Sequence, residues 1–438
     1  MRLWPEGGLW RHSDFLKLWS AETVSQFGTQ VSQLALPLAA IDVLHASAFE
    51  VAALTTVEFL PFLLVSLPAG VWVDRLPRRP ILVMGDLARA GLLGSIPIAY
   101  FLDVLTIWQL YGVGFFVGIA TVFFDVAYQS YLPALVARTE IVDGNAKLEI
   151  SRSAAQFGGP GVAGLLVGWL KAPAAILIDA VSFLASALFI FSIRKTEASA
   201  AAREPRRKMR DELREGLSYV FRHPYLKNIA ACTALFNFFG LLGYAVLLVF
   251  ARRELHLSPQ LIGLAFMVGN LGPLLAALTA GRISKRLGIG HTIIAASVVG
   301  GPMFLLVPFS PHGTAALLLL VPAFFVGGFT GVLYNIAQVS LRQAITPERI
   351  QGRMNSVMRF IVWGAIPLGS LAGGGLASQI GLKQTLIVSG LGCCLPFLPI
   401  AFSPVRSVRD LPEPLEEAPV TDQLLLDAEG AAVPPPRV

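Results

Sequence analysis

The stretch at residues 70–79 lies between two long apolar runs and reads Gly70-Val-Trp-Val-Asp74-Arg75-Leu-Pro-Arg78-Arg79. A glycine at the end of the first run lets that helix approach a neighbour closely. The aspartate can accept hydrogen bonds from N–H groups at a helix start, or pair with an arginine. The three arginines favour the cytoplasmic face of a membrane. We interpret this segment as a tight, basic cytoplasmic loop between two membrane helices.

The composition of the whole chain supports a membrane protein. Of its 438 residues 55% are hydrophobic and only 14% are charged, with a mean hydropathy of +0.66. A soluble domain carries about 25% charged residues. Apolar runs of about 20 residues recur along the chain, and each can span a bilayer core of about 30 Å. We therefore predict an all-α integral membrane fold.

Apolar segments predict twelve transmembrane helices in two six-helix groups. The first six are expected at about 15–41, 51–73, 80–102, 106–131, 150–170 and 173–193. The second six are expected at about 226–251, 260–281, 291–310, 314–338, 354–380 and 383–403. This divides the chain into an N-terminal bundle (1–193), a cytoplasmic basic linker (194–225), a C-terminal bundle (226–403) and a tail (404–438). The tail is rich in Pro, Glu and Ala, so we expect it to be disordered and cytoplasmic.

Lys and Arg residues are distributed unevenly over the predicted loops. With both termini in the cytoplasm, the outer loops contain only Lys171, Arg252, Arg253 and Lys383. This bias predicts a multi-pass protein of the cell inner (plasma) membrane with both termini inside. The same bias accounts for the net charge of +6, so we expect no nucleic-acid partner.

The second half of the chain repeats the first at an offset of about 211 residues. Leu44-His45-Ala-Ser47 recurs as Leu255-His256-Leu-Ser258, and the same step places Gly70 on Gly281 and Arg75 on Arg286. Asp74 meets Lys285, so the second copy has lost the carboxylate. A repeat maintained through helices and loops predicts two related six-helix units, a plan found among secondary transporters.

These features resemble the major facilitator superfamily. The G-x-x-x-D-R-x-x-R-R spacing is similar to the loop between helices 2 and 3 of that family, although Pro77 stands where glycine is usual. The resemblance implies twelve helices in two pseudo-repeats around a central cavity. The alternative is that the segment is only a charged, membrane-flanking loop of another membrane protein.

The resemblance implies that helices 1, 4, 7 and 10 line the cavity. In helix 1, Glu22, Gln26, Gln30 and Gln33 fall on one helix face, which suits a wet cavity better than lipid. The further cavity candidates are polar residues of helices 4, 7 and 10: Tyr128, Gln129, Asn237, Asn335 and Gln338. The alternative for the helix 1 face is a polar seam satisfied by neighbouring helices.

Two intramembrane carboxylates, Glu22 and Glu58, are the candidates for proton coupling. A carboxylate within a membrane is a functional hypothesis by default, and burial favours its neutral form, which suits a proton carrier. The alternatives are a hydrogen-bonded helix contact for Glu58 and a gate or interfacial carboxylate for Glu22.

A cytoplasmic charge network is a further expectation. Asp86 and Arg89, at i and i+3 of one helix, can pair on one face. We predict a gate that latches the outward-facing state and breaks when the cavity opens inward. Its members are Gly70, Asp74, Arg75, Arg78, Arg79, Asp86, Arg89, Asp125, Glu149 and Arg152.

Helix 5 contains Gly158-Gly159-Pro160-Gly161-Val-Ala-Gly164. Small residues permit tight packing and proline bends a helix. Gly159, Pro160 and Gly164 resemble the helix 5 hinge element of the antiporter branch of the superfamily, while generic small-residue packing is the alternative. Asp179 within Ile178-Asp179-Ala-Val-Ser182-Phe183, together with Phe124-Asp125 and Met358-Arg359-Phe360, resembles the macrolide-efflux and enterobactin-exporter-like proteins of that branch.

The resemblance implies a secondary active transporter that exports amphiphilic small molecules, drug-like or macrolide-like, in exchange for protons by alternating access. We expect it to be monomeric, to need no cofactor or metal, and to be no enzyme, since no phosphate-binding loop or catalytic motif occurs in the chain. Two alternatives stay open. One is an exporter or importer of a single metabolite or siderophore on the same fold, and the other is a non-transporting receptor of transporter descent.

Overall fold

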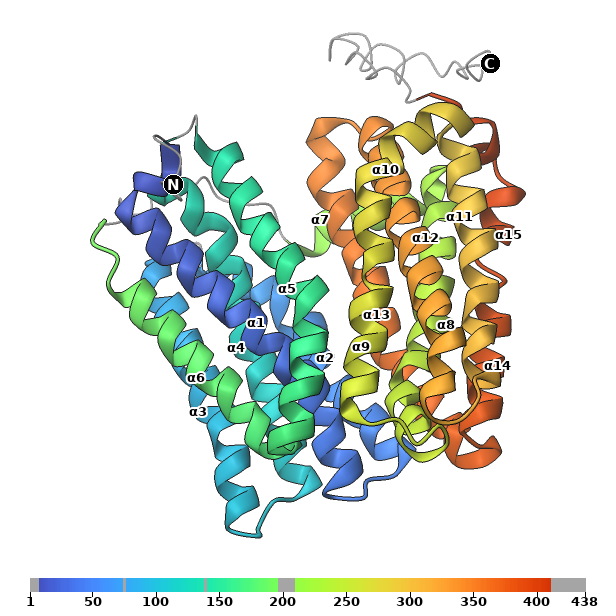
Figure 1. Ribbon diagram of the computed structural model, residues 1–438. Coiled ribbons are helices and arrows are strands. Elements are labelled where there is room, and N and C mark those ends of the chain that lie inside the picture. Colours follow the sequence, from blue (N-terminus) through green and yellow to red (C-terminus); the bar gives the residue numbers. More distant parts are fainter. Residues whose placement is uncertain (1–7, 74–75, 138–139, 196–208, 411–438) are drawn as a thin grey trace, which may run out of the picture.

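The computed structural model describes residues 8–73, 76–137, 140–195 and 209–410, and these are nearly all helical (Figure 1). The helices of the first half are α1 (Ser13–Asp42), α2 (Ala48–Val73), α3 (Arg78–Phe101), α4 (Ile107–Leu135), α5 (Ile141–Leu170) and α6 (Ala172–Phe191). Those of the second half are α8 (Leu226–Arg253), α9 (Pro259–Gly269), α10 (Leu271–Leu287), α11 (Ile289–Met303), α12 (Leu317–Ala344), α13 (Glu348–Ile380), α14 (Leu382–Cys393) and α15 (Phe397–Ala401). Between the halves lies α7 (Met209–Arg222), and four short 3-10 helices complete the set: η1 (Gly8–Arg11), η3 (Phe304–Phe309), η4 (Gly313–Ala316) and η5 (Pro404–Ser407).

Ten segments of the described chain are long and apolar enough to cross a membrane. The helices α1 and α5 are not among them, although each has 30 residues, and both carry charged and amide side chains. The predicted all-α membrane fold is confirmed, and the ten segments together with α1 and α5 are consistent with the twelve expected spans. Several spans in the second half consist of two helical pieces, such as α9 and α10, which meet at Asn270.

Two predicted boundaries were wrong. Helix α5 begins at Ile141 rather than near 150, because its charged first turns form their own contacts, including an i,i+4 pair between Lys147 and Asp143. The tail was predicted to be disordered from Pro404, yet η5 forms there and the Val408 and Arg409 carbonyls accept hydrogen bonds from the N–H groups of Gly290 and Ile289. Residues 196–208 of the predicted linker and 411–438 of the tail lie outside the described residues.

The helices form two bundles side by side, with α1–α6 in one and α8–α15 in the other (Figure 1). The start of α1 and the end of α15 lie on the same side, which we call the terminal side; the other face is the opposite side. The bundles meet mainly through two helix pairs, α5 with α9 and α2 with α13. These pairs are related by the repeat, since the step of 211 residues places α2 on α9 and α10, and α5 on α13.

The repeat found in the sequence is reproduced in backbone hydrogen bonds. On the opposite side, the Ala46 N–H donates to the Ala40 carbonyl at 2.9 Å, and the Leu257 N–H donates to the Ala251 carbonyl at 2.9 Å. The histidine of each Leu-His-x-Ser motif has a positive φ, 52° at His45 and 55° at His256. The two loops therefore share one conformation at the same offset of 211 residues, which supports the two pseudo-repeats.

Close contact between α5 and α9 requires glycine at two positions. A Cβ at Gly164 would lie 2.5 Å from the Pro259 carbonyl oxygen, and one at Gly263 would lie 2.3 Å from the Pro160 carbonyl oxygen. The second helix pair is equally close, because a Cβ at Gly374 of α13 would lie 2.6 Å from the Ala52 Cβ of α2. Glycine at these positions lets the backbones of the two bundles touch.

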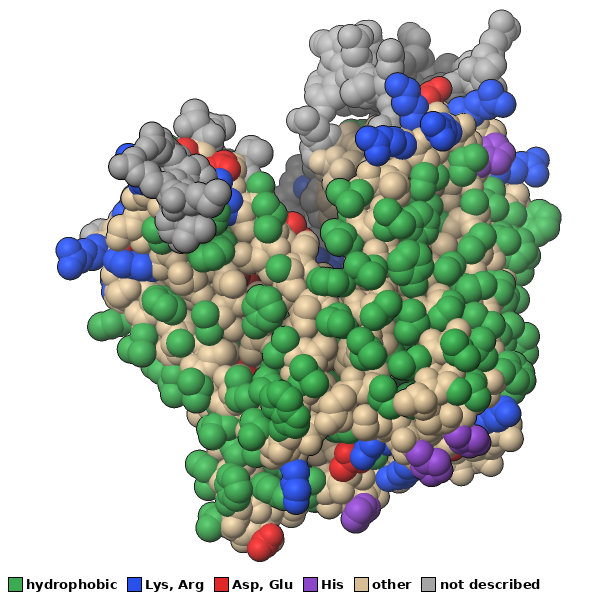
Figure 2. Space-filling model, in the orientation of Figure 1, with side chains coloured by type: hydrophobic (Ala, Val, Ile, Leu, Met, Phe, Trp, Pro, Cys, Tyr) green, Lys and Arg blue, Asp and Glu red, His purple; other side chains and the backbone are tan. Residues whose placement is uncertain are grey.

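An ion pair also joins the bundles on the opposite side. Arg252 Nε of α8 donates to Asp42 Oδ1 at the end of α1 at 2.9 Å, and Arg253 Nη2 donates to the Ala46 carbonyl at 2.6 Å. On the terminal side, by contrast, the space-filling view shows a cleft between the two bundles (Figure 2). The bundles are thus held together on one side and apart on the other.

We predict that Gly164→Val separates the bundles on the opposite side, because the new side chain would overlap the Pro259 carbonyl and the Gly263 Cα. Spin labels on the two sides of the Asp42–Arg252 contact should show a longer distance by double electron–electron resonance. Gly158→Val is the matched control, since a Cβ at Gly158 meets no atom within 4 Å. An unchanged distance distribution in Gly164→Val would contradict this account of the contact.

Candidate transport site

A cavity of about 330 Å³ lies between the bundles, with α1 and α5 contributing from one side and α8, α9 and α12 from the other. Its walls are mostly apolar and aromatic, and they include Tyr244, Phe266, Phe304 and Phe324. The rings of Phe266 and Phe324 stack with centroids 5.0 Å apart. A volume of this size and a lining of this kind are typical of small-molecule sites, which span about 300–1,000 Å³.

A few polar groups interrupt this apolar wall. Gln30 and Gln33 reach it from α1, Asn270 from the junction of α9 and α10, and Ser389 from α14. The Asn270 side chain also donates to the Gln156 carbonyl of α5 at 2.6 Å, which links the two bundles beside the cavity. The cavity therefore offers amide groups that can orient a ligand within an otherwise apolar space.

Of the eight predicted cavity residues, two line this space. They are Gln30 and Gln33; Gln30 also packs on Gly159, where a Cβ would lie 2.4 Å from its Cγ. The remaining six lie elsewhere in the two bundles, some with partners on their own helix, such as Asn335 and Gln338, whose side chains are 3.0 Å apart. The others are Gln26, Tyr128, Gln129 and Asn237.

The first proton-coupling candidate, Glu22, lies on α1 nearer the terminal side than the cavity residues Gln30 and Gln33. Its side chain is buried, with 8% of the residue exposed, and Gln26 Nε2 donates to its Oε1 at 2.7 Å. Electrostatic interactions connect it with Asp125 of α4, Arg89 of α3 and Arg152 of α5. The polar face of α1 is therefore continuous from Glu22 to Gln33, which lines the cavity.

The second candidate, Glu58, lies where α2 crosses α4. The crossing is close, because a Cβ at Gly114 would lie 3.0 Å from Glu58 Cγ and one at Gly118 would lie 2.6 Å from its carbonyl oxygen. Within the described part of the chain, no hydrogen bond reaches the Glu58 carboxyl group. Its charge interacts with Tyr244 of α8, a cavity residue of the other bundle.

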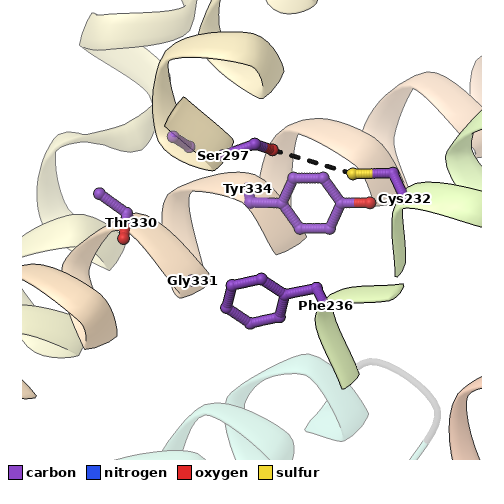
Figure 3. A pocket seen from close by; sticks show the side chains of 7 residues that line it. Cys232, Phe236, Ser297, Thr330, Gly331 and Tyr334 are labelled. Carbon is purple, nitrogen blue, oxygen red and sulfur yellow. Dashed lines mark hydrogen bonds between the residues drawn. The ribbon is translucent and has the colours of Figure 1, made fainter. Parts of the chain in front are cut away.

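A second, much smaller pocket lies inside the C-terminal bundle (Figure 3). It has a volume of about 10 Å³ and is lined from α8, α11 and α12 by Cys232, Phe236, Ala296, Ser297, Thr330, Gly331 and Tyr334. The Cys232 thiol and the Ser297 hydroxyl lie 3.8 Å apart, and the Tyr334 hydroxyl lies 2.7 Å from that of Thr233. This space is about that of one water molecule, so it is too small for a transported organic compound.

The N-terminal bundle buries an arginine between two aromatic rings. The Arg89 guanidinium carbon lies 4.2 Å from the ring centroids of both Phe124 and Phe183. Its Nη2 donates to Asp86 Oδ1, as the i,i+3 spacing predicts, and both residues are almost fully buried. Inside the described structure, Arg89 Nε and Asp86 Oδ2 have no hydrogen-bond partner. This pair therefore lies within the bundle rather than at its cytoplasmic surface.

Asp179 of α6 lies close to this pair and was not among the predicted site residues. It is 1% exposed, and the Ser182 hydroxyl donates to its Oδ1 at 3.0 Å. Across from it, a Cβ at Gly28 of α1 would lie 2.5 Å from the same oxygen. Electrostatic interactions connect Asp179 with Arg89 and Asp86. Sequence reasoning noted this aspartate, but nothing in the sequence relates it to Gly28 or Arg89.

Comparison with known proteins gives a match over nearly the whole chain. Residues 9–428 match the family described as transmembrane secretion effector, a family of major facilitator proteins. The chain belongs to the major facilitator superfamily. It is 26% identical to the multidrug efflux pump Tap of Mycolicibacterium fortuitum, over 84% of this chain and 90% of that one. It is 23% identical to macrolide efflux protein A of Streptococcus pyogenes, over 86% and 92%.

A solved structure has the same fold at low sequence identity. The bacterial homologue of the iron transporter ferroportin, in its inward-facing state, superposes with a TM-score of 0.73 at 17% identity, covering 90% of this chain and 99% of that one. The outward-facing state of such a homologue gives a TM-score of 0.56 at 18% identity, covering 89% and 98%. These structures agree in fold, and the family match over residues 9–428 confirms the resemblance to the superfamily seen in the sequence.

The predicted gate residues of this superfamily member separate into four sets. Asp74 and Arg75 lie outside the described residues, and Gly70 lies within α2 near its end. Arg78 and Arg79 hold the start of α3 to its own bundle, because Arg78 Nε donates to Ser130 Oγ at 3.0 Å and Arg79 Nε to the Ile190 carbonyl at 3.3 Å. The third set, Asp125, Glu149 and Arg152, is exposed. Within the described residues, Asp86–Arg89 is the one ion pair formed inside the predicted gate.

We predict that Arg89→Gln destabilises the protein by about 3–5 kcal/mol, because it leaves the buried Asp86 carboxylate without its partner. The double variant Asp86→Asn/Arg89→Gln should recover a large part of this loss. Thermal unfolding in detergent measures both, with the exposed Arg286→Gln as control. A double variant as unstable as Arg89→Gln alone would show that the lost contacts with Phe124 and Phe183, rather than the unpaired charge, cause the defect.

Proposed function

We propose that this chain exports amphiphilic small molecules across the plasma membrane in exchange for protons, as a monomer that works by alternating access. The main observation in support of this proposal is the cavity of about 330 Å³ between the bundles, with its aromatic walls and few amide groups. Such a lining suits ligands that are largely apolar with a small number of polar groups. The named relatives Tap and macrolide efflux protein A, an efflux pump for multiple drugs and a macrolide efflux protein, support the direction of transport.

The terminal side is assigned to the cytoplasm from the distribution of Lys and Arg. On this assignment the cleft of Figure 2 opens toward the cytoplasm, and the contacts at Gly164, Gly263 and the Asp42–Arg252 pair close the outer side. The greater similarity to the inward-facing than to the outward-facing state of the ferroportin homologue supports this state. In the outward-facing state we expect Asp125, Glu149 and Arg152 to join the gate. We expect Gly159, Pro160 and Gly164 to form the hinge.

Proton coupling is assigned to Glu22 and Glu58. Two observations support this proposal: Glu22 shares the polar face of α1 with Gln30 and Gln33, and Glu58 interacts with Tyr244 in the cavity wall. A carboxyl group that binds a proton in one state and releases it in the other couples proton flow to drug flow. Burial favours its neutral form, because a charged carboxylate is costly within the membrane.

The coupling is tested in inverted membrane vesicles whose lumen is acidified. Addition of a macrolide antibiotic or ethidium should raise the lumenal pH in the parent, since each molecule taken up releases protons. We expect this response to be lost in Glu22→Gln or Glu58→Gln, whichever carries the proton. Glu50→Gln is the control, because Glu50 lies in the first turn of α2, where its Oε2 accepts a hydrogen bond from the Ser47 N–H at 2.7 Å.

Two other results would redirect the proposal. Drug-triggered proton release that persists in both variants would exclude these carboxylates as the carriers. Drug uptake without proton movement would exclude antiport while leaving the transporter in place.

The outer contact gives a second prediction. Reversing one charge, as in Arg252→Asp, places two carboxylates together. It should therefore lower the equilibrium constant for closing the outer side several-fold. The effect stays modest because both side chains are a quarter or more exposed, and such pairs contribute about 1 kcal/mol or less. The swapped double variant Asp42→Arg/Arg252→Asp should restore transport in the vesicle assay. If Arg252→Asp transports as well as the parent and the swapped variant does not restore transport, this pair is not part of the outer gate.

A further inference from the structure

The linker helix α7 borders a groove that the transport site does not use. The groove has a volume of about 660 Å³ and is lined by Arg214, Ser218, Tyr219, Arg222, His223, Pro224 and Ile350. It lies on the terminal side, where α7 packs against α13 and the start of α8. The central cavity is lined by other residues, so the two spaces are separate.

Two neighbouring membrane spans indicate where this groove lies relative to the bilayer. Pro224 comes two residues before the span that begins at Leu226, and Ile350 comes three residues before the span that begins at Arg353. Residues directly outside the apolar core of a bilayer lie among the lipid headgroups. The groove therefore lies at headgroup level, on the face that the Lys and Arg bias assigns to the cytoplasm.

Its polar groups are hydrogen-bond donors suited to an anion. Arg214 and Arg222 carry guanidinium groups, which match phosphate oxygens, and Ser218 adds a hydroxyl group one helical turn from each of them. Burial lowers the pKa of His223 below its usual value, which favours the neutral imidazole. Since His223 Nδ1 accepts from the Tyr225 N–H at 3.3 Å, the ring proton is on Nε2, where it can be donated.

The helix that bears these donors is held firmly. Val220 is fully buried in the core of the C-terminal bundle, and a Cβ at Gly216 would lie 3.1 Å from the Arg353 carbonyl oxygen of α13. The rings of Tyr219 and His223 lie 5.7 Å apart, which fixes the histidine against the helix. Phe221, 56% exposed, leaves an apolar side chain beside the basic one of Arg222, as on helices that lie in a membrane interface.

We propose that the groove between α7 and the start of α13 binds the phosphate headgroup of an anionic phospholipid of the cytoplasmic leaflet. The surrounding chain is net basic, because residues 203–223 contain seven Lys and Arg and four Asp and Glu. Basic segments next to membrane helices attract anionic lipids. A lipid also fits better than a soluble phosphate, because the groove lies beside two membrane spans and an exposed phenylalanine. Since α7 packs on α13 and on the start of α8, the lipid would be bound against the C-terminal bundle on the terminal side.

The test uses the full-length protein purified in a mild detergent, with native mass spectrometry to count retained lipids. Dioleoyl-phosphatidylglycerol and dioleoyl-phosphatidylcholine are added at equal concentration to the parent and to Arg214→Gln/Arg222→Gln. We expect the parent to retain phosphatidylglycerol preferentially, and the double variant to lose this preference by on the order of tenfold. Arg282→Gln, an exposed arginine of α10 on the same side, is the matched control and should behave as the parent.

A soluble arm separates the two sources of phosphate. Inorganic phosphate and glycerol 3-phosphate are added at millimolar concentration, and neither should displace the retained lipid. Equal retention by parent and double variant would overturn the proposal, and so would displacement by inorganic phosphate alone. If the double variant does not fold, Arg222→Lys keeps the charge but loses the paired donors, and it should retain less lipid than the parent. The readout does not depend on transport, so it stands apart from the vesicle assay.

Discussion

The contact between the two bundles is the constraint on which the rest of this structure depends. Helices cannot approach backbone to backbone unless both lack side chains at the crossing, and α5 and α9 meet this condition at Gly164 and Gly263. The repeat supplies a second close crossing, α2 with α13 at Gly374. Because both crossings lie toward the same side, the bundles diverge toward the other. The cavity and the cleft follow from that divergence.

The bilayer imposes the second constraint, since polar groups are costly against hydrocarbon. The chain satisfies it by turning such groups toward the bundle interiors or toward the space between them. Gln30 and Gln33 face the central cavity, while Asp86, Arg89 and Asp179 are enclosed within the N-terminal bundle. Arg89 lies between the faces of two phenylalanine rings, which stabilise its cation in the buried interior of the bundle.

The two halves share a backbone but have diverged in charge. Their loops on the opposite side have the same backbone hydrogen bond, and each contains a histidine with a positive φ. Yet the step of 211 residues places Asp42 on Arg253, and Asp74 on Lys285. The first of these differences lies on the opposite side, where Arg252 pairs with Asp42 and Arg253 Nη2 donates to the Ala46 carbonyl. Divergence of a repeat thus supplies a contact that two identical halves could not form.

The membrane class, the repeat, the order of the spans and the superfamily could all be predicted from the chain's residues, because apolar runs, loop charges and motif spacing are local and periodic. The pairing of Asp86 with Arg89 could be predicted too, because it needs only one helical turn. Which polar residues contact one another depends on the tertiary structure. The cavity has residues of α1, α8, α9 and α12 in its wall, and Asp179 comes close to Gly28 and Arg89 only after α6 packs on α1 and α3. Such contacts depend on how helices rotate and cross, and no pattern within one segment specifies this.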